Sequence, residues 1–451
     1  MKNEELSGVK SEECRVKSCD YLQDIHSGQF SNHNSSLFTL HSSLHNSSLF
    51  TLHSSLINAD TREFIRRHAD DDVKTLALKA WGTEGIDIHF ALDQIAGRQT
   101  ARQKLPAWAA TEGIVYPPHI SMEQCSSETT ALYKQKLSLN TSQQQSFVDL
   151  TGGFGVDFSY VARNFGKAIY VERQQHLCDI ARENFQLLGL TQAEVVCEEA
   201  EKYLETMTHA DLIYLDPARR DSSGARTFAI SDCTPDVISL RDLLLKKADT
   251  VMLKLSPMLD WRKAVSDLGE RNVSEVHVVA VNNECKELLV VMTATETESI
   301  RIVGSDGVTS FQYTIDNGHS LSANNKTQLT DNPLFLYEPN ASLMKIGCFD
   351  KLEERFGVGQ VATNSHLFIS DKEVNDFPGR SFRIVATTTM NKRDVKAALA
   401  DVKSANIAVR NFPLSVAELR KRLKLKDGGD TYIFATTDAY DQHKLFICKK
   451  T

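Results

Sequence analysis

The most constraining feature of this sequence is a change of hydrophobic period at residue 146. From there, short apolar runs recur at 147–150, 168–171, 194–197, 211–215 and 250–255. Most of them are separated by stretches that are long enough to hold a helix. Strands that alternate with helices form a parallel sheet with helices on both faces. We therefore expect an α/β domain whose parallel strands end at one common edge.

The region before this domain has two parts. Residues 1–57 contain the segment HNSSLFTLHSSL twice in tandem, at 33–44 and 45–56. Two copies of 12 residues are too few and too short to form a solenoid, so we expect a disordered, low-complexity leader. Residues 58–145 show apolar side chains at three- and four-residue spacing, which predicts a helical module whose helices are separated at glycines such as Gly97.

Composition narrows the class of protein. The chain has 451 residues, nine cysteines without a Cys-x-x-Cys pair, and no apolar run near the roughly 18 residues of a membrane-spanning helix. It does not begin with a secretory signal pattern. These features are typical of a cytoplasmic protein with reduced thiols and no membrane partner. The histidines are dispersed, so no metal site is expected.

Charge is distributed unevenly along the chain. The net charge is −8, yet residues 391–451 hold 13 Lys and Arg against 7 Asp and Glu, whereas the rest holds 38 against 52. A basic C-terminal segment on an otherwise acidic chain is typical of a protein that binds a polyanion through that segment. A solvated basic helix is the alternative.

A glycine-rich turn is the first candidate for chemistry. The sequence Asp149-Leu-Thr-Gly-Gly-Phe-Gly155 follows a predicted strand and precedes a predicted helix. Glycines there let the backbone turn tightly and approach a ligand, and the helix N-terminus offers free amides. The segment does not fit G-x-G-x-x-G, which makes a pyrophosphate site the weaker interpretation.

This turn resembles the first motif of class I S-adenosylmethionine-dependent methyltransferases. The resemblance implies that Asp149, Thr151 and the glycines 152, 153 and 155 bind the amino-acid end of that cofactor. Glu172 ends the next predicted strand, where a carboxylate can accept hydrogen bonds from both ribose hydroxyls. Glu198 and Glu199 follow the third strand, and we assign Glu199 to the position that contacts the adenine amino group.

An Asp-Pro corner ends the fourth predicted strand. Methyltransferases that act on exocyclic amino groups of bases carry Asp or Asn, then Pro-Pro and an aromatic residue there. The resemblance implies that Asp216 contacts the cofactor and orients the target amine, and that Pro217 and Arg219 belong to the catalytic corner. Ala218 and Arg219 depart from the pattern, so we expect Arg219 or Arg220 to pair with a phosphate or carboxylate. A structural helix-start turn with exposed arginines is the alternative.

From about residue 60 to the end, the chain resembles bacterial predicted RNA methyltransferases with a ferredoxin-like insertion and a THUMP-like C-terminal domain. The resemblance implies a Rossmann-like class I methyltransferase sheet at 146–295, a ferredoxin-like or linking α+β region at 296–375 and a THUMP-like RNA-binding domain at 376–451. It also implies that the substrate is a structured RNA, either tRNA or rRNA. The expected RNA-binding residues are basic: Arg220, Lys254, Arg410, Arg420, Lys421, Arg422 and Lys424.

Two classes of function stay open. The first is an S-adenosylmethionine-dependent enzyme that methylates structured RNA at a base amino group. The second is a noncatalytic RNA-binding or scaffold protein that keeps the fold, which the missing aromatic residue after Pro217 favours. Methylation at pyrimidine C5 needs a cysteine nucleophile, which usually follows a proline, and the chain has no Pro-Cys pair. Methylation of a protein or small molecule would leave the basic C-terminus unexplained.

Overall fold

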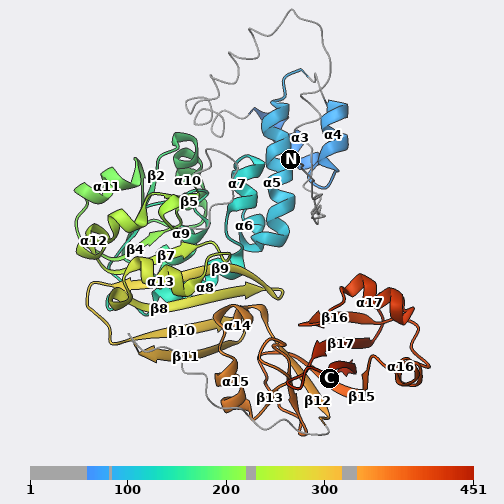
Figure 1. Ribbon diagram of the computed structural model, residues 1–451. Coiled ribbons are helices and arrows are strands. Elements are labelled where there is room, and N and C mark those ends of the chain that lie inside the picture. Colours follow the sequence, from blue (N-terminus) through green and yellow to red (C-terminus); the bar gives the residue numbers. More distant parts are fainter. Residues whose placement is uncertain (1–57, 81–83, 220–229, 317–332) are drawn as a thin grey trace, which may run out of the picture. The chain divides into compact units, whose positions relative to one another are not determined.

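The computed structural model describes residues 58–80, 84–219, 230–316 and 333–451. The expected leader, residues 1–57, and Arg220 lie outside these ranges. The N-terminal module is helical, as expected (Figure 1). Its helices are α3 (Ala59–Arg67), α4 (Val73–Ala80), α5 (Ile88–Lys104), α6 (Pro106–Ala110), α7 (His119–Gln124) and α8 (Glu128–Ser138). No described helix has both the length and the apolar character needed to cross a bilayer.

One expected helix boundary in this module is wrong. Gly97 was expected to separate two helices, but it lies inside α5, which runs through without a break. A Cβ at Gly97 would come within 2.4 Å of the Tyr116 Cβ. The glycine therefore permits close packing against the segment that carries Tyr116. A sequence pattern cannot distinguish this use of glycine from a helix end, because both depend on the missing side chain.

The central domain is a nine-stranded sheet in the order β11-β10-β8-β9-β7-β4-β1-β2-β3. Its strands are β1 (Ser146–Asp149), β2 (Lys167–Glu172), β3 (Ala193–Cys197), β4 (Ala210–Leu215), β7 (Ala248–Leu255), β8 (Val273–Val281), β9 (Glu284–Thr293), β10 (Ser299–Ser305) and β11 (Ser310–Asp316). Strands β3, β2, β1, β4 and β7 are parallel. Strand β9 runs antiparallel to β7 and β8, which confirms the expected hairpin.

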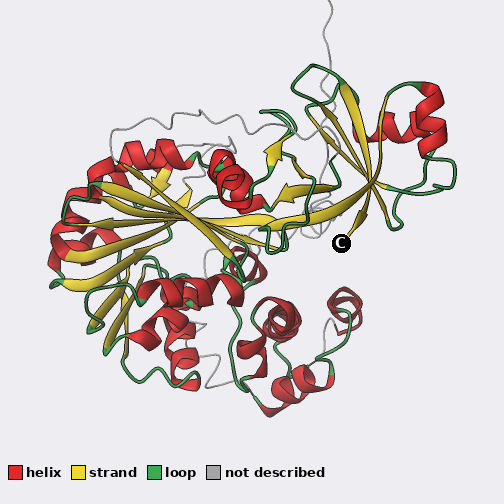
Figure 2. Cartoon of the chain, turned by 90° about the horizontal axis from the view of Figure 1, so that it is seen from below, coloured by secondary structure: helices red, strands yellow, loops and turns green. Residues whose placement is uncertain are grey.

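Helices lie on both sides of this sheet (Figure 2). They are α9 (Val156–Val161), α10 (Gln175–Leu187), α11 (Ala200–Thr206), α12 (Val237–Lys247) and α13 (Trp261–Leu268); the short strands β5 (Ala218–Arg219) and β6 (Cys233–Thr234) pair with each other. Successive residues of β1 enter different cores, Phe147 on one face and Val148 on the other. Burial on both faces explains why these strands read as continuous apolar runs.

The expected end of the methyltransferase sheet differs from the observed one. The sequence predicts a boundary at 295–296, but β10 pairs in parallel with β8, and β11 pairs with β10. The sheet therefore continues to Asp316. Its extension is packed by α14 (Ala341–Ile346), which contacts β10, β8 and β9. Gly304 on β10 makes this approach possible, because a Cβ there would lie 3.0 Å from Leu343 and Ile346 atoms.

The C-terminal part is a second sheet of seven strands in the order β13-β14-β12-β15-β18-β17-β16. Its strands are β12 (Phe335–Pro339), β13 (Gly359–Gln360), β14 (Phe368–Ser370), β15 (Gly379–Thr389), β16 (Asn406–Arg410), β17 (Thr431–Thr437) and β18 (His443–Lys450), with helices α15 (Phe349–Phe356), α16 (Lys392–Ala398) and α17 (Val416–Leu423). The ferredoxin-like or linking region expected at 296–375 and the THUMP-like domain expected at 376–451 both contribute strands to this sheet, since β12 pairs with β15.

Candidate active site

The glycine turn connects β1 to α9 at the carboxyl edge of the sheet. Asp149 ends β1, and its Oδ1 accepts a hydrogen bond of 2.9 Å from the Thr151 amide. The Gly155 amide closes the turn by donating to the Gly152 carbonyl at 2.8 Å. Gly153 and Gly155 have φ values of +55° and +83°, which a side chain would strain. At its glycines the turn thus presents bare backbone.

Glycine is required at position 152 for a different reason: the ring of Tyr170 leaves no space for a side chain there. This buried residue lies on β2, and its hydroxyl donates a hydrogen bond to the Gly153 carbonyl. A Cβ at Gly152 would come within 2.1 Å of the ring. The strand that follows the turn therefore fixes the turn's conformation through one aromatic side chain.

Gly152→Ala is expected to lower the free energy of unfolding by about 1–3 kcal/mol, because the added methyl group overpacks a rigid ring. Urea unfolding followed by circular dichroism measures the change. Gly166→Ala is the control, since its Cβ would meet nothing closer than 3.5 Å and its φ is not positive. A Gly152→Ala protein as stable as this control would contradict the close contact with Tyr170.

Glu172 ends β2 and connects the turn to the neighbouring loop. Its two carboxylate oxygens accept hydrogen bonds from the Gly153 amide at 3.0 Å and the Gln174 amide at 2.9 Å. The side chain is largely buried yet lines the cavity described below. Two amides that donate to one carboxylate hold it in a single orientation. Glu172 is thus a fixed acceptor beside the glycine turn.

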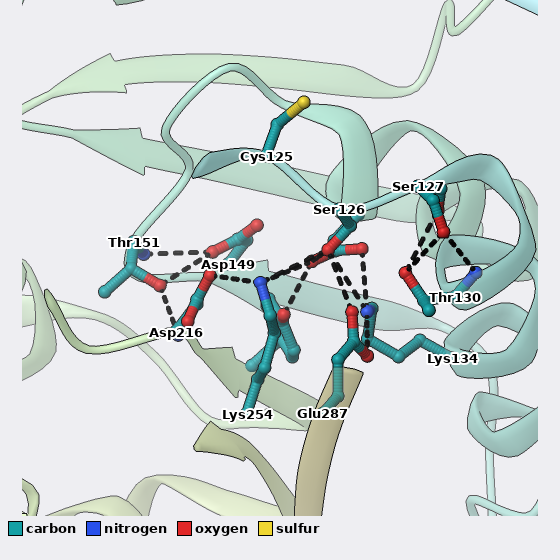
Figure 3. Close-up of polar contacts among 12 residues, drawn as sticks. Cys125, Ser126, Ser127, Thr130, Lys134, Asp149, Thr151, Asp216, Lys254 and Glu287 are labelled. Carbon is teal, nitrogen blue, oxygen red and sulfur yellow. Dashed lines mark hydrogen bonds and ion pairs between the residues drawn. The ribbon is translucent and has the colours of Figure 1, made fainter. Parts of the chain in front are cut away.

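Asp216 lies at the end of β4, on the other side of β1. Its amide donates to the Thr151 hydroxyl at 2.6 Å, and its carboxylate Oδ2 accepts from Lys254 Nζ at 2.6 Å (Figure 3). Pro217 is buried and Ala218 is exposed. Lys254 comes from β7, whose side chains at this end reach the same edge. Thr151, Asp216 and Lys254 thus meet from three different strand ends.

Four further polar residues form a buried charged cluster behind this pair, and the sequence did not predict them. Lys134 on α8 binds Glu287 on β9 at 2.5 Å and Asp157 on α9 at 3.1 Å. The Ser126 hydroxyl donates to Asp157 at 2.7 Å. It accepts from Lys254 at 3.2 Å (Figure 3). We call Ser126, Lys134, Asp157 and Glu287 the buried cluster. It fixes Lys254 from the side opposite to Asp216.

The pKa shifts follow from this arrangement. Burial raises the pKa of Asp149 well above its ordinary value, and the carboxylates of Asp157 and Asp216 add to the effect. Burial alone would lower the pKa of Lys254, but Asp216, Asp157 and Glu287 outweigh it and hold that pKa above the usual range. Burial alone would raise the pKa of Asp157, which Lys134 and Lys254 instead keep low. The neighbouring carboxylates therefore favour the protonated form of Lys254.

These groups share one cavity of about 630 Å³. It lies beyond the carboxyl ends of the parallel strands, next to β1, where the strand order reverses; this is the usual ligand position in such sheets. Among the residues that line it are the expected ones: Asp149, Thr151, Gly152, Gly153, Gly155, Glu172, Glu199, Asp216 and Lys254. Glu198 also lines it, so the choice of Glu199 for adenine stays a prediction.

The other expected residues lie elsewhere or are not described. Arg219 has its backbone in β5, while its side chain and all of Arg220 lie outside the described part of the chain. Arg410 binds the buried Glu338 at 2.9 Å. Arg420 donates to the Ala405 carbonyl at 2.9 Å and pairs with Asp427. Both arginines therefore have structural partners, whereas the side chains of three other residues are exposed: Lys421, Arg422 and Lys424.

Comparison with family models finds three matches. Residues 132–230 match the model named Conserved hypothetical protein 95, residues 335–378 match a ferredoxin-like domain, and residues 379–450 match a THUMP domain-like model. A search of curated proteins found no match. Among the described residues, no group of His, Cys, Asp and Glu side chains is arranged to hold a metal ion.

Comparison with solved structures finds a protein of Porphyromonas gingivalis W83 that is classed as a methyltransferase. It is 32% identical, with a TM-score of 0.75, over 86% of this chain and 97% of that one. A Streptococcus mutans protein of the same class, solved with S-adenosylhomocysteine, is 14% identical over 37% and 97% of the chains, with a TM-score of 0.28. A Pyrococcus horikoshii protein classed as an RNA methyltransferase is 14% identical over 43% and 97%, with a TM-score of 0.32. The first match decides the assignment: the chain belongs to the same methyltransferase family as the Porphyromonas gingivalis protein, with the methyltransferase fold followed by ferredoxin-like and THUMP-like domains.

Proposed function

We propose that this protein is an S-adenosylmethionine-dependent methyltransferase that acts on structured RNA, such as tRNA or rRNA. One observation carries the proposal: the glycine turn, Glu172 and Asp216 line a single cavity at the point where the strand order reverses. Family membership supports a methyltransferase fold and leaves the reaction to be tested.

The residues present fit this cofactor. A Cβ at Gly155 would come within 2.8 Å of the Phe185 ring and one at Gly152 within 2.1 Å of the Tyr170 ring, so the cavity is lined by bare backbone at these two positions. A cavity of about 630 Å³ is within the usual range for a ligand of nucleoside size. Carboxylates line it on several sides, which suits a ligand with an ammonium and a sulfonium group but no phosphate.

Each side chain then has a definite task. Glu172, fixed by two amides, accepts hydrogen bonds from ribose hydroxyls. Asp149 faces the amino-acid end, where a bound ammonium group would favour its ionised form against the effect of burial. Asp216 lies where the acceptor of the methyl group must enter. The cofactor supplies a methyl group on a positively charged sulfur, and the chain supplies orientation and the exclusion of water.

The C-terminal domain supports RNA as the substrate. Residues 379–450 match a THUMP domain-like model, and basic side chains are exposed on and beside α16 and α17: Lys392, Arg393, Lys396, Lys403, Lys421, Arg422, Lys424 and Lys426. Lysine and arginine contacts to phosphates supply affinity that depends little on sequence and falls with salt. Arg410 and Arg420 contribute less than expected, because they already bind Glu338 and Asp427.

Replacing Lys421, Arg422 and Lys424 together by alanine is expected to weaken RNA binding by tenfold or more at about 0.1 M salt and to flatten its salt dependence. Electrophoretic mobility shifts at several salt concentrations with total tRNA measure both effects. A control variant with Lys167, Lys202 and Lys263 changed to alanine removes as much charge from the central domain. Equal losses in the two variants would mean that α17 has no special part in RNA binding.

The proposed function is tested by titrating the whole protein with S-adenosylmethionine in a calorimeter and by counting labelled methyl groups transferred to total tRNA and rRNA. Binding followed by transfer to RNA is the expected result. Binding without transfer would favour the noncatalytic RNA-binding protein, for which the absence of an aromatic residue after Pro217 is the main support. The acceptor that the Asp-Pro corner predicts, a base amino group, also remains a prediction.

A further inference from the structure

The pairing of Asp216 with Lys254 bears on which atom receives the methyl group. An exocyclic amine needs hydrogen-bond acceptors for its N–H groups, and it gains positive charge as it is methylated. Here one oxygen of Asp216 already accepts from the Lys254 ammonium at 2.6 Å. An ammonium group donates only and cannot accept. A cation beside the acceptor atom also opposes the developing charge of an amine.

A hydroxyl group has the opposite requirements. It is a weak nucleophile until its proton is removed, and its oxygen carries negative charge as the proton leaves. A fixed cation at hydrogen-bond distance stabilises that charge, and a carboxylate beside it can take the proton. Lys254 and Asp216 are such a pair, both line the cavity, and they lie at the carboxyl ends of adjacent strands.

The buried cluster holds Lys254 in this position and in this charge state. Ser126 Oγ lies 3.2 Å from Lys254 Nζ, and Asp157 lies 3.8 Å from it. Asp157 is itself fixed by Lys134 at 3.1 Å and by the Tyr214 hydroxyl at 2.7 Å. These contacts restrain the Lys254 side chain beside Asp216. Fixed donors of this kind are what a developing oxyanion requires.

The walls of the cavity do not suit a base placed for amine methylation. The corner from Asp216 to Arg219 contains no aromatic residue, and Arg219 stands at the position that a stacking ring would occupy. Among the described lining residues the aromatic ones are Phe154 and Tyr214, which are 5% and 2% exposed. Neither offers a free face for a base. A ribose hydroxyl can enter without such a platform.

We propose that the methyl acceptor is a ribose 2′-hydroxyl of RNA, with Lys254 and Asp216 as the catalytic pair and Lys134 as a positioning residue. The inference rests on the proposed function, because it assumes S-adenosylmethionine and RNA. In the transfer, the hydroxyl O–H bond breaks and its proton passes to the Asp216 carboxylate. The oxygen forms a bond to the methyl carbon, and the carbon–sulfur bond breaks with its electrons left on sulfur, which becomes a neutral thioether.

The position of the methyl group can be read from alkaline hydrolysis. The whole protein is incubated with methyl-labelled S-adenosylmethionine and total RNA from cells that lack its gene, and the RNA is then hydrolysed in alkali. A 2′-O-methyl group blocks cleavage of the adjacent phosphodiester, so the expected label appears in dinucleotides. Label in mononucleotides would mean base methylation, which overturns this inference and leaves the proposed function intact. Absence of label in any RNA overturns both.

The role of Lys254 is tested by Lys254→Met, which removes the ammonium group and keeps an unbranched side chain one atom shorter. We expect the rate of transfer to fall about 100-fold, while the calorimetric Kd for S-adenosylmethionine, measured without RNA, changes less than threefold. Lys286→Met is the matched control, since Lys286 lies beside Glu287 on β9 but is exposed and paired with Glu284. Full activity of Lys254→Met, or an equal loss of cofactor binding, would overturn the role of Lys254.

Discussion

Asp216→Ala is expected to lower the rate of methyl transfer about a thousandfold while leaving the affinity for S-adenosylmethionine within a factor of about three. In the proposed mechanism Asp216 takes the proton, and loss of such a group typically lowers a rate about 10²–10⁴-fold. The substitution also removes the nearest partner of Lys254, at 2.6 Å. The glycine turn and Glu172 are untouched, because Asp216 meets the turn through its amide, which alanine keeps.

Single-turnover kinetics with labelled cofactor and calorimetry without RNA separate the two quantities. Asp249→Ala is the control, since Asp249 lies at the opposite end of β7 and pairs with His209. A parallel loss of transfer and of cofactor affinity would show that Asp216 holds the cofactor and does not act on the acceptor. A normal rate would remove Asp216 from the mechanism altogether.

The same carboxylate predicts a pH dependence. Burial raises the pKa of Asp216, and Lys254 opposes the shift without reversing it. Only the ionised form can take a proton, so transfer should decline as the pH falls through a value above that of an ordinary aspartate. The decline should be absent from the small residual activity of Asp216→Ala.

The parts of the site that could be predicted from the sequence each lie at the carboxyl end of a strand. Asp149, Glu172 and Asp216 follow apolar runs, and parallel strands bring such residues to one edge whatever the details of packing. For these residues, local sequence and general topology are sufficient.

The buried cluster could not be predicted in this way, because its members come from elements far apart in the chain. Lys134 and Glu287 are separated by 153 positions and belong to a helix and an antiparallel strand. A lysine on an amphipathic helix is normally assigned to solvent. The available signal was weak: Asp157 lies in a helix whose other residues are apolar or small, and Glu287 directly precedes a run of five apolar residues. A charge at a position where burial is expected indicates a buried partner.

The same limit affects the basic C-terminal surface. Arg410 appears in the sequence as one of several cations, but Glu338, 72 positions earlier, is its partner. The net charge is a count of charged residues, and it does not show which basic side chains are already paired with a carboxylate in the folded protein. Of the C-terminal residues that were expected to bind RNA, Lys421, Arg422 and Lys424 have exposed side chains, and their role stays a prediction.

Lys134→Met is expected to destabilise the protein by about 3–5 kcal/mol, the usual cost when one partner of a buried ion pair is removed. The Lys134 side chain is fully buried, and its loss leaves Glu287, 3% exposed, without its cation. Lys254 would then be the single lysine facing Asp157, Asp216 and Glu287. Urea unfolding measures the change, and Lys136→Met on the exposed face of the same helix is the control.

The double variant Lys134→Met with Glu287→Met separates charge from shape. It removes the pair together and fills the space with apolar atoms, so it should be markedly more stable than Lys134→Met alone. Such recovery of stability should not restore methyl transfer, because Lys254 would have lost the neighbours that fix it. If Lys134→Met costs less than about 1 kcal/mol, water must reach Glu287 and the cluster is not a closed unit. If the double variant is as active as the original protein, the cluster serves the fold and Lys254 needs only Asp216.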